Sequence, residues 1–198
     1  MNRVIFLVIF LIVGIGTTYY LVLSEEEEPA TLPVINPIDL EDEMVDPELL
    51  RIGYGHKIGD FSFDNQNGEK ITQQEVDDKV YVAEYFFTTC KSICPIMNRH
   101  MQRVQKANEG SKDFKILSFT VDPKTDTVAQ MKRYAEGHGA LGDQWHFLTG
   151  KKEELYALAR KSFFVLKPAE AQNLGDAGSD FIHTNNFVLV DRERRIRG

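Results

Sequence analysis

The chain has 198 residues, of which 30 are acidic and 23 basic, so that its formal net charge at pH 7 is −7. A chain of this length can hold one domain with additional segments. The acidic balance and the lack of a basic groove-like pattern argue against nucleic-acid binding, because the arginines near the C-terminus form only a short cluster. Two cysteines are too few for a disulfide scaffold, so they indicate a site instead.

The N-terminal segment predicts a helix that spans a membrane. Residues 4–23 carry no charge and are numerous enough to cross a bilayer core. Arg3 precedes them and Glu25–Glu28 follow, which places the N-terminus in the cytoplasm and the rest outside. A cleaved signal peptide is the alternative, but its apolar core is shorter and ends in small residues, unlike residues 19–21. We expect a retained anchor over residues 1–24, in a bacterial inner membrane with the globular domain on the periplasmic side.

The next segment, residues 25–50, is acidic, contains four prolines and shows little periodicity. Such composition is typical of a tether that holds a domain away from the membrane. Residues 51–198 are then expected to form the globular domain.

The globular part alternates between strand-like and helix-like runs. A turn-rich stretch at residues 65–68 predicts an opening hairpin between residues 59–63 and 70–72. The expected strands cover residues 80–87, 115–121, 145–148 and 186–191, and the expected helices cover residues 95–107, 127–136 and 152–161. Strands that alternate with helices imply crossover units, so we expect an α/β fold of the thioredoxin-like type.

Two details of this pattern concern element ends. The helix at residues 127–136 is expected to begin at a cap formed by Thr125 or Asp126 and to stop at Gly137. A thioredoxin-like domain is expected to continue beyond residue 198 with a further strand and a final helix. We therefore expect that the chain is clipped or that its terminal elements are reduced.

Cys90 and Cys94 are the only cysteines, and they lie where the strand at residues 80–87 meets the helix at residues 95–107. Random placement of two cysteines would give this spacing about one time in a hundred. A helix N-terminus favours negative charge and lowers the pKa of a thiol. The pair can close a disulfide or bind one soft metal ion, and a pair of inert buried thiols is the remaining alternative.

The donor set favours copper over zinc. Two thiolates suit copper(I), whereas structural zinc takes four protein ligands and the sequence has no second cysteine pair. A third ligand would come from a histidine, and His183 lies in a loop just before a strand, where it can point toward the site. The other histidines are better explained as surface or packed residues; they are His56, His100, His138 and His146. Met97 and Met101 share one helix face and could assist copper, although core packing is the simpler interpretation.

These motifs resemble the Sco/SenC family, the membrane-anchored copper chaperones of cytochrome c oxidase assembly. The resemblance covers about residue 58 to the end and rests on four motifs in the family's order: residues 85–95, residues 118–127, residues 147–150, and His183 before the last strand. It implies a thioredoxin-like fold and a single N-terminal span.

The resemblance also implies a metal site and a partner. Cys90, Cys94 and His183 would bind a copper ion, as Cu(I) or Cu(II), and the protein would deliver it to oxidase subunit II or reduce the cysteines of the binuclear copper site there. Asp122 belongs to a family motif, and we expect only a structural or partner-facing role for it. Family members often have Pro-Asp after the first cysteine, whereas this chain has Lys91-Ser92, which should favour thiolate and bears on the choice of partner.

Two enzymatic alternatives use the same cysteines. A thiol–disulfide reductase of envelope proteins would need only Cys90 and Cys94, but general oxidoreductases usually have two intervening residues rather than three. A peroxidase would need a peroxidatic cysteine in a polar pocket. We expect primarily a metallochaperone, and whether it also acts as a thiol–disulfide oxidoreductase stays open.

Overall fold

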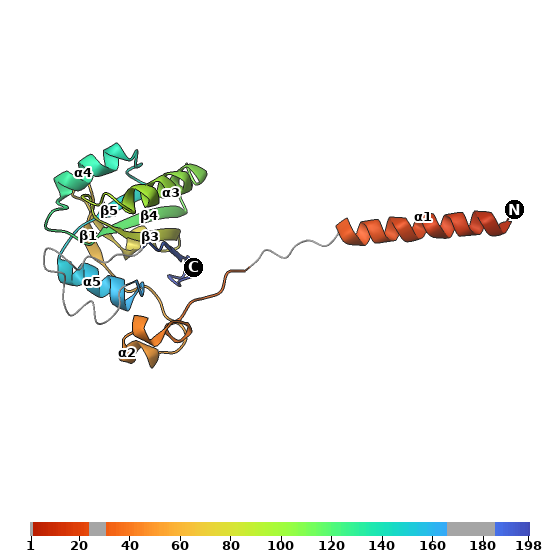
Figure 1. The fold of residues 1–198 in the computed structure, drawn as a ribbon, viewed down its shortest axis with the longest axis horizontal. Helices are drawn as coiled ribbons and strands as arrows, with labels where there is room; N and C mark the ends of the chain where they lie inside the picture. Colours follow the sequence, from red (N-terminus) through yellow and green to blue (C-terminus); the bar gives the residue numbers. More distant parts are fainter. Residues whose placement is uncertain (1, 24–30, 166–184) are drawn as a thin grey trace. The chain divides into compact units, whose positions relative to one another are not determined.

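The computed structural model describes residues 2–23, 31–165 and 185–198. The chain divides into two compact units, Met1–Leu32 and Pro33–Gly198. The first unit contains the expected apolar helix, α1 (Asn2–Leu23; Figure 1). By length and composition its segment Arg3–Tyr20 could cross a membrane, a test that a signal sequence also passes.

A four-stranded sheet forms the centre of the second unit, in the order β5-β4-β3-β6 (Figure 1). Strands β3 (Val80–Phe86), β4 (Phe114–Thr120) and β5 (Trp145–Leu148) are parallel, and β6 (Val188–Val190) is antiparallel to β3. All four strands were expected. Every residue of β4 is buried, because a central strand is covered on both faces.

Strand β6 is shorter at both ends than the predicted strand at residues 186–191. The Asp191 carboxylate accepts hydrogen bonds from the N–H groups of Glu193 and Arg195, which turns the chain back on itself. Ile196 then forms isolated β-bridges with Val190 and with Ile35.

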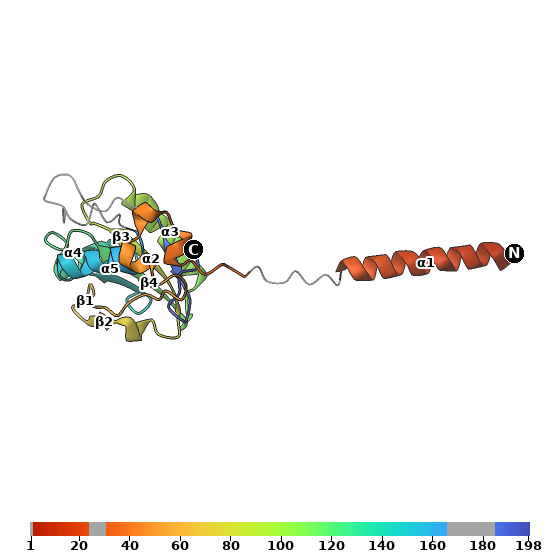
Figure 2. The same cartoon turned by 90° about the horizontal axis from the view of Figure 1, so that it is seen from below.

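Helices cover both faces of the sheet, as Figures 1 and 2 show. Helices α3 (Cys94–Ala107) and α4 (Val128–Gly137) lie on one face, and α5 (Lys152–Lys161) lies on the other. Side chains of β3 alternate between the two layers. Ala83 and Tyr85 pack in the core cluster that includes α5, whereas Phe86 packs with Cys94 in the cluster on the other face. This is the expected thioredoxin-like α/β arrangement.

The expected opening hairpin is also present. Strands β1 (Ser62–Asp64) and β2 (Lys70–Thr72) pair in antiparallel orientation. The side-chain oxygen of Asn65 accepts hydrogen bonds from the backbone N–H groups of Asn67 and Glu69, and Gly68 adopts φ +77° in the turn.

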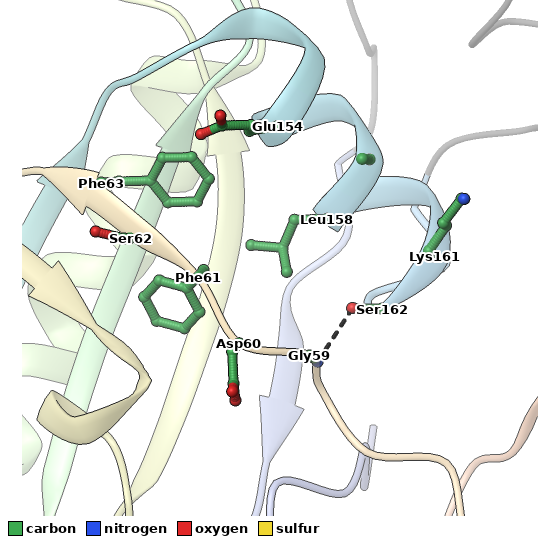
Figure 3. A pocket seen from close by; sticks show the side chains of 10 residues that line it. Gly59, Asp60, Phe61, Ser62, Phe63, Glu154, Leu158, Lys161 and Ser162 are labelled. Carbon is green, nitrogen blue, oxygen red and sulfur yellow. Dashed lines mark hydrogen bonds between the residues drawn. The ribbon is translucent and has the colours of Figure 1, made fainter.

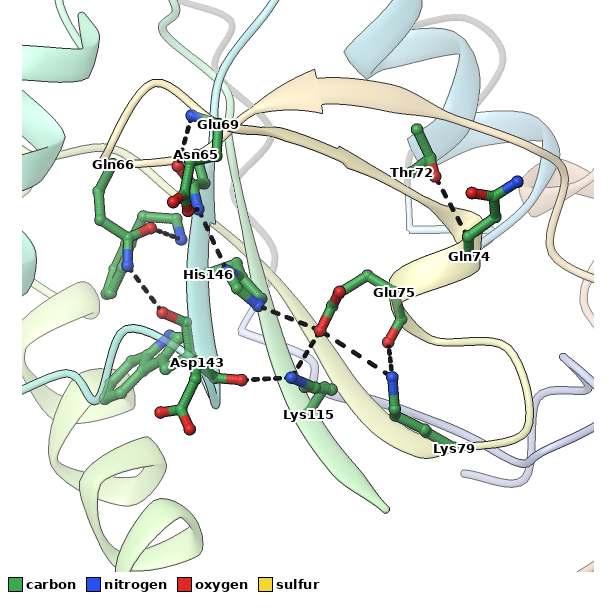
Figure 4. Close-up of polar contacts among 12 residues, drawn as sticks. Asn65, Gln66, Glu69, Thr72, Gln74, Glu75, Lys79, Lys115, Asp143 and His146 are labelled. Carbon is green, nitrogen blue, oxygen red and sulfur yellow. Dashed lines mark hydrogen bonds and ion pairs between the residues drawn. The ribbon is translucent and has the colours of Figure 1, made fainter. Parts of the chain in front are cut away.

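A polar cluster joins this hairpin region to the main sheet (Figure 4). Glu75, in the 3-10 helix η3 (Gln73–Glu75), forms an ion pair of 2.6 Å with Lys115 of β4. His146 of β5 is buried, and its ring nitrogens lie 3.4 Å from the Asn65 amide and 3.9 Å from the Glu75 carboxylate. His146 is thus a packed residue, as expected.

Residues 33–50 differ from the expected tether, because they pack against the globular unit. Val45 is 1% exposed, and several apolar side chains of this segment contact the same core: Ile35, Leu40, Met44, Leu49 and Leu50. The segment forms the short elements η1 (Pro37–Asp39), η2 (Asp42–Met44) and α2 (Pro47–Leu50). The apolar residues of this segment follow neither the period of a helix nor that of a strand. The prediction of a tether therefore rests on the acidic residues and prolines between them.

Candidate metal centre

The two cysteines lie at the turn between β3 and α3, where the sequence predicted them. Strand β3 ends at Phe86, and Cys94 is the first residue of α3. Pro95 follows within the first helical turn, where the lack of a backbone N–H costs nothing. Cys90 lies in the intervening loop.

The two sulfur groups are in direct contact through hydrogen bonds. Both cysteines are free thiols; Cys94 is 3% exposed and Cys90 is half-buried. The backbone N–H of Cys94 donates to Sγ of Cys90 at 3.5 Å, and the Ser92 hydroxyl lies 3.7 Å from the same sulfur. These donors stabilise negative charge on Cys90 in particular.

The acidity of the two thiols therefore differs. Partial burial opposes ionisation of Cys90, but hydrogen bonds from the thiol and N–H of Cys94 and from Ser92 outweigh it and bring its pKa to about 7. Burial, together with the hydrogen bond to Cys90, raises the pKa of the Cys94 thiol to about 12. The helix start thus lowers the thiol pKa of Cys90, whereas Cys94 keeps its proton near neutral pH.

A buried carboxylate holds the loop that leads to Cys90. Asp126 is 0% exposed, and both of its carboxylate oxygens lie 3.2 Å from the backbone N–H of Thr88. The hydroxyls of Thr88 and Thr120 donate to the same carboxylate at 2.5 Å. Asp126 is therefore not the cap of α4, and the predicted cap at Thr125 or Asp126 is wrong.

The cap of α4 is instead Thr127, whose hydroxyl accepts a hydrogen bond from the N–H of Gln130. The sequence suggested Asp126 as a cap because it lies next to the helix start, and its distant partners are visible only in the folded chain. Asp122, from the same motif, donates its backbone N–H to the Thr120 hydroxyl at 2.9 Å and is half-buried.

His183, the expected third ligand, lies outside the described residues. Among residues 2–23, 31–165 and 185–198, no group of three or more His, Cys, Asp or Glu side chains could hold a metal ion. The described part of the site therefore supplies two sulfur donors.

The other histidines and the two methionines have separate environments. Nε2 of His56 lies 2.8 Å from the Ser162 carbonyl oxygen, His100 is exposed, and His138 lies at the C-terminal end of α4 near Asn98. Both methionines of α3 are buried, Met97 at 3% and Met101 at 0% exposed, as their packing interpretation requires.

A groove of about 540 Å³ lies between β1 and α5 (Figure 3). Phe61, Phe63 and Leu158 form its apolar lining, and Glu154 and Lys161 stand at its margin. Neither cysteine lines this groove. It belongs to the α5 side of the sheet, whereas Cys94 belongs to the α3 side.

Comparison with known proteins identifies the family. The family model described as SCO1/SenC matches residues 52–198. The chain belongs to the SCO1/SenC family. A SCO1 protein homolog of Bacillus subtilis is 33% identical over 144 residues, which cover 71% of this chain and 72% of that protein.

Two solved structures of this family are similar in fold. BsSco, a member of the Sco family of cytochrome c oxidase assembly proteins in which a disulfide switch was identified, is 33% identical, with a TM-score of 0.59. That similarity covers 72% of this chain and 81% of BsSco. Arabidopsis thaliana ScoI, whose structure contains bound copper, is 26% identical, with a TM-score of 0.52 over 70% of this chain and 83% of that one.

Proposed function

We propose that this protein is a membrane-anchored copper-binding protein for the assembly of cytochrome c oxidase. Its copper ligands are Cys90, Cys94 and His183. The observation that carries this proposal is the hydrogen-bonded thiol pair at the start of α3, in a chain that belongs to the SCO1/SenC family. Helix α1 serves as the retained anchor and leaves the globular unit on the outer side of the membrane.

The donor set fits copper. Thiolates are soft ligands that select copper(I), and Cys90 is already partly ionised near neutral pH because its pKa is about 7. Cys94 holds its proton until metal binds, since burial raises the pKa of its thiol to about 12. Uptake of copper is therefore accompanied by proton release from both thiols. The imidazole of His183 would complete a three-ligand site.

The recipient is the binuclear copper site of oxidase subunit II, to which the protein delivers copper or whose cysteines it reduces. In the reductive step, the Cys90 thiolate attacks a target disulfide, and Cys94 resolves the mixed disulfide. The two thiols lose two electrons and two protons, and the target gains both as two free thiols. Since a disulfide cannot coordinate copper, the redox state of the pair controls metal capture.

A copper(I) titration of the full chain in detergent, against a chromophoric chelator, tests the proposed ligands. We expect one equivalent per chain, with affinity reduced at least about tenfold in each of the variants Cys90→Ala, Cys94→Ala and His183→Ala. His100→Ala is the matched control, because His100 is exposed on α3. Unchanged affinity in His183→Ala would exclude the three-ligand site.

The alternative, a thiol–disulfide reductase of envelope proteins, is favoured by the unequal acidity of the two thiols, which suits an attacking and a resolving cysteine. This function needs no histidine ligand. If His183→Ala keeps full reductase turnover and a deletion strain regains no oxidase activity on added copper, reduction is the physiological role. Rescue of the deletion strain by copper supports delivery.

A further inference from the structure

The solvent side of α3 carries a row of cations beside the cysteine loop. Arg99, Arg103 and Lys106 are exposed and lie within about 60° of one another around the helix axis. Lys91, next to Cys90 in the loop, is exposed as well. These four residues are named the α3 basic face.

The charge of this face contrasts with that of the chain. The chain has 30 acidic and 23 basic residues, yet residues 85–108 contain these four cations and no acidic residue. Within the described part of the chain, none of the four forms an ion pair. Arg195 and Arg197, in contrast, both pair with Asp191 at 2.9 Å. Among the described residues, therefore, no acidic side chain neutralises the α3 basic face.

The face begins near the cysteine pair, because Arg99 lies five residues after Cys94, or about 7.5 Å along the helix axis. The opposite side of α3 is buried and includes Cys94 and Met101, so the helix presents its cations outward while its first residue carries a thiol. Ile96, in the first turn, is 42% exposed. Lys91 and Ile96 are therefore two exposed side chains close in the chain to the half-buried Cys90.

We propose that the α3 basic face, together with Ile96, is the docking surface for a protein partner with an acidic surface. The partner is guided by charge so that its own sulfur or metal-binding groups arrive at Cys90. This inference deepens the proposed function by naming the chemistry of the partner, and it rests on that function only for the identity of the cargo.

An anionic membrane is the other surface that could attract these cations. The sequence argues against it, because Glu25–Glu28 directly follow the membrane-spanning segment and would be repelled by anionic headgroups. The cations also lie close in the chain to the Cys90 thiol, with which a protein partner can react and a lipid surface cannot. Electrostatic guidance of this kind raises association rates by about 10-fold to 1,000-fold at low salt and fades as the Debye length shrinks.

A disulfide-exchange assay on the full chain in detergent tests the docking surface without copper. The probes are acidic, neutral and basic peptides, each with one cysteine blocked as a mixed disulfide with thionitrobenzoate. The Cys90 thiolate attacks the peptide sulfur, the protein–peptide disulfide forms, and thionitrobenzoate leaves with the electron pair as a coloured anion. We expect the acidic peptide to react about tenfold or more faster than the basic one at low salt, and the ratio to approach one at high salt.

The decisive variant is the triple charge reversal Arg99→Glu, Arg103→Glu and Lys106→Glu, which should invert the preference between the two charged peptides. The matched control reverses three exposed cations elsewhere that form no ion pair in the described residues: Arg51→Glu, Lys57→Glu and Lys132→Glu. It alters the net charge equally and should keep the wild-type preference. Rates relative to the neutral peptide remove any change in the intrinsic reactivity of Cys90.

The proposal would be overturned if the wild type reacted equally fast with the acidic and the basic peptide. It would also be overturned if both triple variants lost the preference for the acidic peptide to the same extent. Amide exchange on the full chain in nanodiscs gives a further test: protection of α3 by phosphatidylglycerol but not by phosphatidylcholine would assign the face to the membrane and overturn it too. Copper(I) stoichiometry of the triple variant should stay at one equivalent. If the wild type bound no copper(I) but still reacted faster with the acidic peptide, the proposed function would be contradicted and the docking surface would still be supported.

Discussion

At the scale of single residues, Glu84 in β3 is a buried carboxyl group whose pKa is raised. It is 1% exposed, and one carboxyl oxygen accepts a hydrogen bond of 2.6 Å from the Ser118 hydroxyl. Ser118 in turn accepts from the indole N–H of Trp145 at 2.8 Å, while the second oxygen of Glu84 has no partner among the described residues. Burial raises the pKa of Glu84 to about 7, although the hydrogen bond from Ser118 opposes the shift.

This shift makes stability depend on pH. Between the ordinary carboxyl pKa and about 7, the folded protein keeps a proton on Glu84 that the unfolded chain has lost, so the free energy of unfolding falls as pH rises. We expect Glu84 to account for a loss of about 2 kcal/mol between pH 5 and pH 8. Between pH 5 and pH 8, the free energies of unfolding in urea of the wild type and of the exposed control Glu136→Gln should each fall by about 2 kcal/mol more than that of Glu84→Gln. Parallel losses in all three proteins would contradict the assignment.

At the scale of elements, Asp126 connects the loop after β3, the end of β4 and the start of α4. Its carboxylate binds Thr88 and Thr120, and the adjacent Thr127 caps α4. Since Thr88 lies close before Cys90 in the loop, the position of the first thiol depends on a residue from a distant part of the chain. Removal of the carboxylate leaves buried donors unsatisfied, which is more costly than loss of a solvent-facing cap.

The two neighbours allow a matched comparison. Asp126→Ala is expected to lower the free energy of unfolding by about 3 kcal/mol, and Thr127→Ala by about 1 kcal/mol. Amide exchange at residues 88–93 should rise in Asp126→Ala and stay unchanged in Thr127→Ala. Urea unfolding and hydrogen-exchange mass spectrometry measure the two effects. If both variants behaved alike, Asp126 would be an ordinary helix-start residue.

At the scale of the whole molecule, the globular unit extends further toward the N-terminus than composition suggests. The compact unit begins at Pro33, and Val45 is buried in the core that β3 and α5 share. Ile35 is tied to Ile196 by a backbone hydrogen bond of 2.9 Å, so the two ends of this unit support each other.

Two truncations separate the anchor from the packed segment. Deletion of residues 1–32 should leave the unfolding midpoint of the domain unchanged, because that stretch forms a unit of its own. Deletion of residues 1–50 should cost about 3 kcal/mol or more, because it uncovers apolar core surface, including the site of Val45. Thermal and urea unfolding of both proteins give the comparison. Equal stability would show that residues 33–50 are dispensable for the domain.

Local patterns in the sequence were sufficient for most of the fold. The strand Trp145–Leu148 and the helix Lys152–Lys161 match their predicted bounds, and the cysteine pair lies at the predicted junction of β3 and α3. Apolar runs, helical periodicity and turn residues act over a few neighbouring positions, so a sequence displays them directly.

The tertiary structure decided the properties that depend on contacts between distant segments. It placed residues 33–50 against the core, brought the Asp126 carboxylate to Thr88 and Thr120, and buried Cys94 so that its thiol keeps its proton. Burial and hydrogen bonding set each of these outcomes, and both arise only when residues far apart in the chain come together. No local pattern carries that information.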